Sequence, residues 1–166
     1  MKRFLFLISL LVGCGAEQAC QSSGRINRRL PPPVRSDCLP EHISPRVHDR
    51  VKYAIELFSQ DATRHEVPCY RTPIIGFLPK MPPDLESGVI GYCTPGNEVR
   101  FLTPYWDYAS ATTRLTLVYH ELGHCALGLD HTDGEADIMN TYILSEPTAE
   151  KKWDELVNKM FERSKR

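Results

Sequence analysis

The chain has 166 residues, of which 42% are hydrophobic and 25% charged, and its formal net charge is −1 at pH 7. These values are typical of one ordinary globular domain. The near-neutral charge balance gives no electrostatic reason to expect nucleic acid as a partner. We expect a protein that acts as a monomer.

The first residues have the organisation of a secretory signal peptide. A charged n-region, residues 1–3, precedes a short apolar h-region, residues 4–12. This apolar run is too short to span a bilayer as a helix of the mature protein. The sequence therefore predicts a signal peptide over residues 1–13 and export of the rest of the chain.

The signal ends in Leu11-Val12-Gly13-Cys14, which resembles the bacterial lipobox. The resemblance implies cleavage before Cys14 and its acylation, with palmitate as an expected chain, so that the protein is lipid-anchored to a membrane of the bacterial cell envelope. Gly15 is not the aspartate associated with inner-membrane retention, which leaves the outer membrane open. The alternatives are ordinary cleavage near Gly15 or Ala16, or a free Cys14 in a secreted protein. Residues 14–37 are polar and proline-containing, which indicates a lipidated N-terminus and flexible tether.

The following residues predict a helix and then a group of strands. Ser44 and Pro45 are suited to a helix start, and an apolar stripe follows at helical spacing, which indicates a helix that backs a sheet. Short apolar runs at residues 73–78, 88–93 and 98–102 read as strands. Thr94-Pro95-Gly96-Asn97 separates the last two, which predicts a hairpin.

Two further helices complete the expected domain, residues 38–166. The first runs over residues 112–127, and an amphipathic C-terminal helix covers about residues 148–164. We therefore expect an α+β fold in which a twisted mixed sheet packs against a backing helix, a motif-bearing helix and a C-terminal helix.

The motif is His120-Glu121-Leu122-Gly123-His124. Two histidines at i and i+4 project from one face of a helix about a turn apart, which suits two imidazoles that share one zinc ion. Glu121 lies about 100° round the helix from His120, where its carboxylate reaches the water at the metal instead of the metal itself. Glu121 is therefore the candidate general base.

A third ligand follows the helix. Gly128 suits a left-handed helix cap, after which the chain can return His131 towards the metal. Three neutral imidazoles with an open fourth position are typical of a catalytic zinc site and not of a closed structural one. The sequence predicts one catalytic zinc held by His120, His124 and His131.

These residues resemble the metzincin metallopeptidases, most closely the matrixin branch, whose pattern is His-Glu-x-x-His-x-x-Gly-x-x-His followed by a Met-turn. Met139 is eight residues past His131, as a matrixin Met-turn methionine would be. The resemblance implies a zincin fold, with Met139 as the hydrophobic base beneath the metal. It also makes Tyr142, three residues later, a candidate that stabilises the oxyanion or approaches the metal.

The match departs from the family at one point. Cys125 makes the interval between His124 and the glycine one residue longer than the family pattern. We interpret this as a single insertion, with the turn at Gly128 compensating for it. Strict family spacing would instead place Asp130 at the third-ligand position and Leu127 at the turn, so Asp130 remains an alternative ligand.

The predicted function is that of a zinc-dependent endopeptidase acting on a peptide or protein substrate. In one alternative, a zinc peptidase of another class takes a downstream carboxylate, such as Glu146 or Glu150, as its third ligand. In another, an envelope lipoprotein binds zinc without cleaving anything. Glu121 argues against this second alternative, because ligation alone does not need it.

Six cysteines in an exported chain predict disulfides, since oxidising compartments allow disulfides to persist. Cys69 and Cys93 flank the expected sheet and are the first candidates for a pair. A helical projection places Cys125 near the apolar face, turned away from His120 and His124, as a core or bridged cysteine and not a zinc ligand.

Overall fold

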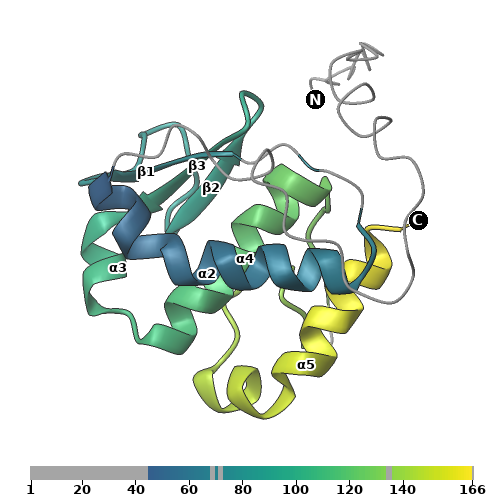
Figure 1. The fold of residues 1–166 in the computed structure, drawn as a ribbon. Helices are drawn as coiled ribbons and strands as arrows, with labels where there is room; N and C mark the ends of the chain where they lie inside the picture. The colour runs from purple at the N-terminus through teal and green to yellow at the C-terminus, as the bar shows by residue number, and fades with distance from the viewer. Residues whose placement is uncertain (1–44, 68–69, 71–72, 134–135, 166) are drawn as a thin grey trace, which may run out of the picture.

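The computed structural model describes residues 45–67, 70, 73–133 and 136–165. The predicted signal peptide, the Cys14 anchor and the tether lie outside the described residues. Figure 1 shows the described part as a small sheet with helices packed against it. The expected α+β class is confirmed.

Within the part of the chain that the structure describes, three strands form a mixed sheet in the order β1-β3-β2. Strands β1 (Ile74–Leu78) and β3 (Glu98–Leu102) are parallel, whereas β2 (Gly91–Thr94) is antiparallel to β3. The predicted hairpin is confirmed, and its turn is closed by a hydrogen bond from the Asn97 N–H to the Thr94 carbonyl at 2.9 Å. Within the described sheet β2 is therefore an edge strand.

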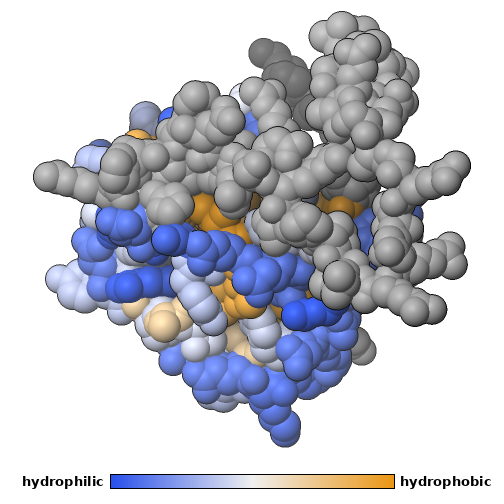
Figure 2. Space-filling model, in the orientation of Figure 1, coloured by the Kyte–Doolittle hydropathy of each residue, from blue (hydrophilic) through white to orange (hydrophobic). Residues whose placement is uncertain are grey.

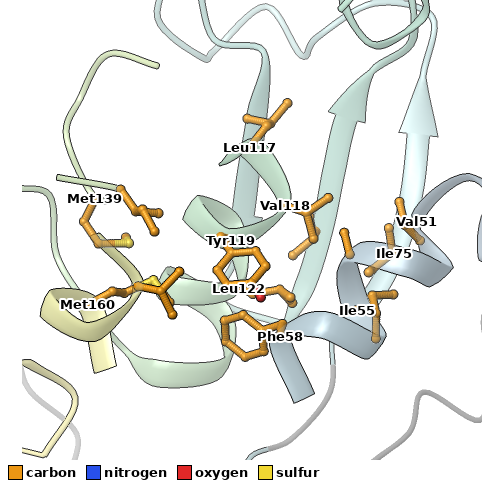
Figure 3. Packing of buried hydrophobic residues seen from close by; sticks show 14 of the residues in the cluster. Val51, Ile55, Phe58, Ile75, Leu117, Val118, Tyr119, Leu122, Met139 and Met160 are labelled. Carbon is orange, nitrogen blue, oxygen red and sulfur yellow. The ribbon is translucent and has the colours of Figure 1, made fainter. Parts of the chain in front are cut away.

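Helices α2 (Pro45–Arg64) and α4 (Ala111–Leu127) pack against the sheet, α2 near β1 and α4 near β2 and β3. The apolar stripe of α2 faces α4, as Figure 3 shows for Ile55 and Phe58 beside Val118 and Leu122. The α2 side of the molecule is mainly hydrophilic (Figure 2), as expected of a helix with one buried face.

Helix α4 is the centre of the fold. The Ser110 side chain caps it by accepting a hydrogen bond from the Thr113 N–H at 3.1 Å. The eight consecutive residues from Thr116 to Gly123 are all buried, which covers the full circumference of the helix. The sheet, α2 and α5 all contact α4, so the middle of this helix is enclosed by other elements.

Helix α5 (Glu146–Arg163) begins two residues earlier than predicted and packs on α4. Its buried face includes Leu156, Met160 and Phe161. A short helix that was not predicted, α3 (Thr103–Tyr108), follows β3 and buries Trp106 against Phe101. Among the described residues, no helix combines the length and apolar character needed to cross a membrane.

The structure corrects the predicted cysteine pairing. Cys93 forms its disulfide with Cys125 and not with Cys69, which lies outside the described residues. The bridge joins β2 to α4, with a Cα–Cα separation of 5.6 Å. Cys125 is therefore bridged, as one reading of the sequence expected, but it faces the edge strand and lines the cleft with His120 and His124 instead of turning away from them.

The bridge closes a loop with a sequence separation of 32. Removing it with the double substitution Cys93→Ser/Cys125→Ser should lower the free energy of unfolding by about 3–4 kcal/mol, because the unfolded chain regains loop entropy. Urea unfolding of the two proteins under oxidising conditions measures this difference. Equal unfolding midpoints and slopes would contradict it.

Candidate metal centre

Three imidazoles converge at the end of α4. His120 and His124 come from the helix and His131 from the loop after it, and their Nε2 atoms are separated by 3.1 Å (120–124), 3.1 Å (124–131) and 3.2 Å (120–131). Two nitrogens that each lie about 2.0–2.1 Å from one ion at a tetrahedral angle are about 3.3–3.4 Å apart. The three nitrogens are therefore spaced so that they could hold a single metal ion.

The other ring nitrogens explain why the Nε2 atoms face inward. Nδ1 of His120 lies 2.8 Å from the Ile138 carbonyl oxygen, and Nδ1 of His124 lies 2.6 Å from that of Leu129. A carbonyl only accepts, so each Nδ1 carries the hydrogen and each Nε2 keeps its lone pair for a metal. Burial lowers the pKa of His120 to about 4 and also lowers that of His124, which favours the neutral imidazoles that ligation needs.

The additional residue near Cys125 is absorbed into the helix. Helix α4 continues to Leu127, and Gly128 adopts the predicted left-handed conformation with φ 66°. The Gly128 N–H donates to the His124 carbonyl at 3.2 Å, which closes the last turn before the chain leaves the helix. This turn brings His131 to the other two histidines, whereas the Asp130 carboxylate does not join the group.

Glu121 lies beside the histidines and is 3% exposed. Among the described residues its Oε2 atom has no hydrogen-bond partner, although a buried polar atom normally has one. Burial raises the pKa of Glu121 to about 8, and a cation held by the adjacent imidazoles would lower it again. The carboxylate thus retains a free acceptor atom, as a base for a water or substrate proton requires.

Gly91 of β2 makes room for this carboxylate. A Cβ atom at position 91 would lie 2.7 Å from Glu121 Oε1, closer than real Cβ contacts come. Gly91 was not among the residues predicted from the sequence, although a glycine inside a strand often marks a close approach of another group. The edge strand therefore passes directly over the candidate base.

The site opens into a cleft of about 610 Å³. Helix α4 and the loop after it contribute the three histidines, Glu121 and Cys125, and the sheet side contributes β2 together with Leu85 and Val89 of the preceding segment. Its lining includes every residue of β2, so the open space beside the edge strand is larger than a single ion needs.

Met139 is fully buried, and its sulfur packs against the motif helix at Gly123. Gly123, in the middle of the motif, has no side chain at the point where the Met139 sulfur packs, and a Cβ there would collide with that sulfur. The main chain at Met139 is linked to the loop that carries His131, because the Thr132 N–H donates a hydrogen bond to the Met139 carbonyl at 2.8 Å.

A buried carboxylate that the sequence analysis missed organises this turn. Asp137 accepts a hydrogen bond from the Met139 N–H at 2.8 Å and has ion-pair contacts with Lys159 at 3.3 Å and Arg163 at 3.5 Å from α5. Arg163 also donates to the Asp130 carbonyl at 2.9 Å, next to His131. The end of α5 therefore links the Met139 turn to the loop that carries the third histidine.

If the three histidines hold a metal ion, we expect Arg163→Ala to weaken its binding by about 10-fold, within the 10–100-fold range for residues that support metal ligands from outside the ligand set. Competition with a chromogenic zinc chelator measures the affinity. Lys165→Ala is the matched control, because it removes the same charge from the same end of the chain but pairs with Glu162. Identical affinities for the two variants would show that Arg163 does not support the site.

Other residues singled out in the sequence are not part of this group. Tyr142 is 80% exposed and lies outside the lining of the cleft. The Glu146 and Glu150 carboxylates accept hydrogen bonds from Thr113 and Thr112 at the opposite end of α4 from the histidines. In this structure neither glutamate is placed as a third ligand.

The chain was compared with protein-family models, curated proteins and solved structures, and no match was found in any of the three.

Proposed function

We propose that the protein is a zinc-dependent endopeptidase with a metzincin-like domain. The observation that carries this proposal is the pairing of two features in one cleft: three imidazole nitrogens that converge on a point, and a buried carboxylate with a free oxygen beside them. A site meant only to hold an ion has no use for this carboxylate.

Imidazole donors in this number favour zinc over hard cations such as Mg²⁺ or Ca²⁺, which prefer oxygen ligands. Zinc bound by three histidines acts as a Lewis acid that polarises a carbonyl and brings the pKa of a water towards about 7. His120, His124 and His131 would hold this ion, and the carbonyls of Ile138 and Leu129 keep the first two rings in their binding orientation.

Glu121 supplies the proton transfers. Its carboxylate takes a proton from the attacking water and later delivers it to the amine that leaves when the peptide bond breaks. Both roles require an oxygen that is not occupied by another donor, and Oε2 meets this requirement within the described residues. Glu121 is 3% exposed, which limits the access of bulk water to this proton.

Strand β2 offers the substrate a docking edge. The Ile90 carbonyl accepts a hydrogen bond from the Leu102 N–H. Hydrogen-bonded and non-hydrogen-bonded residue pairs alternate along antiparallel strands, so the main-chain N–H and C=O groups of Tyr92 and Thr94 also face β3. Those of Gly91 and Cys93 then point away from β3, along the cleft. An extended peptide can pair with this edge and so place its backbone over Glu121.

The order of elements supports the finer assignment of the fold. A backing helix, a mixed sheet, the motif helix, a methionine turn and a C-terminal helix follow one another, as in the zincin arrangement that the motif resembles. A buried methionine that packs against the motif helix, here Met139 at Gly123, is the feature specific to the metzincin branch. The proposal is therefore a minimal metzincin-like domain.

We also propose that the enzyme works in the bacterial cell envelope, anchored to a membrane through an acylated Cys14. The signal and lipobox-like residues carry this part of the proposal. A disulfide in the catalytic domain is consistent with it, because disulfides persist in oxidising compartments outside the cytosol. The substrates would be peptides or proteins within reach of that membrane.

The test is cleavage of an unfolded protein such as casein by the purified protein, before and after removal of metal with a chelator. We expect cleavage that stops on chelation and returns when one equivalent of zinc is added. Zinc binding without cleavage of casein or of a diverse peptide library would favour the alternative, a zinc-binding lipoprotein without catalytic activity.

A further inference from the structure

Two contacts join the edge strand β2 to the motif helix α4. Gly91 packs on Glu121, and Cys93 is bonded to Cys125. Residues two apart on a strand share a face and span about 6.6 Å, while residues four apart on a helix share a face and span about 6 Å. The two contacts therefore form successive rungs between strand and helix, with matched spacing.

We propose that the Cys93–Cys125 disulfide is a positioning element of the catalytic site. It fixes the register of β2 against Glu121, so that a peptide docked on this edge presents its scissile bond to the base. This inference rests on the proposed peptidase function. It assigns a role to the additional residue that separates the motif of this chain from the family pattern.

The side chains of β2 do not belong to the buried hydrophobic core. All four of its residues are half-buried and none is fully buried, in contrast to the buried Val99 and Phe101 of the adjacent strand. The segment from Pro79 to Ile90, which leads into β2, forms neither helix nor strand. Hydrogen bonds hold β2 to β3, and the Cys93–Cys125 disulfide joins β2 covalently to α4.

The residues that form the two rungs are also those that face a substrate. The main-chain groups of Gly91 and Cys93 point along the cleft, while their Cα and side-chain atoms contact α4. Any shift of β2 therefore moves a docked peptide relative to Glu121. A misplacement of about 1 Å can cost a reaction about 100-fold in rate.

Reduction would release this constraint. Two electrons and two protons from an external dithiol convert the Cys93–Cys125 bond into two thiols, and the dithiol itself becomes a disulfide. The two sulfur atoms can then no longer remain at bonding distance. We expect peptidase activity to decrease on reduction while the three histidines keep their zinc.

The experiment compares the full chain with its Cys93→Ser/Cys125→Ser variant, which avoids the effect of a reductant on other cysteines. We expect the variant to keep one zinc per chain and to lose about 10–100-fold in kcat/KM on a peptide substrate, mostly in kcat. Hydrogen exchange should be faster at the Tyr92 and Thr94 amides, which bond β3, and unchanged in β1.

A second destabilised variant shows whether a loss of activity comes from a displaced β2 or only from a less stable fold. Ile55→Ala removes a buried side chain of α2, away from the cleft, and leaves the disulfide intact. At a temperature where both variants are folded, it should keep the wild-type kcat. A double-serine variant with wild-type kcat/KM, or with a loss no larger than that of Ile55→Ala, overturns the proposal.

Failure of the proposed function gives a different result. If the wild-type protein cleaves no peptide, the peptidase proposal fails, and hydrogen exchange decides the role of the bridge. Unchanged exchange at Tyr92 and Thr94 in the double-serine variant then overturns the inference that the disulfide fixes β2. Faster exchange confined to these amides supports it.

Discussion

Glu121→Gln should reduce kcat about 10²–10⁴-fold while the protein still binds one zinc ion. Glutamine keeps the size of the side chain but cannot accept a proton, and general acid–base catalysis contributes a factor of this order. Steady-state hydrolysis of a fluorogenic peptide measures the loss, and metal analysis of the same sample measures the zinc.

The control variant Glu121→Asp separates the presence of a carboxylate from its position. It keeps the carboxylate but withdraws it from the space that Gly91 leaves for the longer side chain. We expect activity between those of the wild-type protein and Glu121→Gln. A glutamine variant that cleaves peptides at the wild-type rate would show that Glu121 is not the base.

His131→Ala should weaken zinc binding by more than about 100-fold. The Nε2 atom of His131 is one of three that converge on the metal position, and loss of a mere supporting partner already costs 10–100-fold. Peptidase activity should then need a large excess of zinc. Competition with a chelator of known affinity measures the change.

Asp130→Ala is the matched variant, because it tests the neighbouring residue that strict family spacing would select. In the structure Asp130 contributes its main-chain carbonyl to Arg163, and substitution of the side chain leaves this group in place. We expect zinc affinity close to that of the wild type. A larger effect at Asp130 than at His131 would reverse the assignment of the third ligand.

Local chemistry allowed much of the site to be predicted from the sequence. The spacing of His120 and His124 places two imidazoles on one helix face, and Gly128 marks the end of the helix because it tolerates the left-handed conformation seen there. The hairpin followed from its turn residues in the same way. Each of these features depends on residues close together in the chain.

Features that depend on tertiary packing were missed or wrongly assigned. The partner of Cys93 is in a helix with a sequence separation of 32, and no pattern in one sequence identifies such a pair. The role of Asp137 depends on Lys159 and Arg163 reaching it from α5. Helix α3 is too short for a helical period to be recognised, and the burial of Trp106 stabilises it.

The most direct test of the site is X-ray absorption at the zinc edge of the zinc-loaded protein. Our account predicts three imidazole nitrogens at about 2.0–2.1 Å and one further light atom, as in an open catalytic site. Sulfur at about 2.3 Å, or a shell closed by a fourth protein side chain, would contradict it. Either result would indicate a structural zinc and remove the basis for the peptidase.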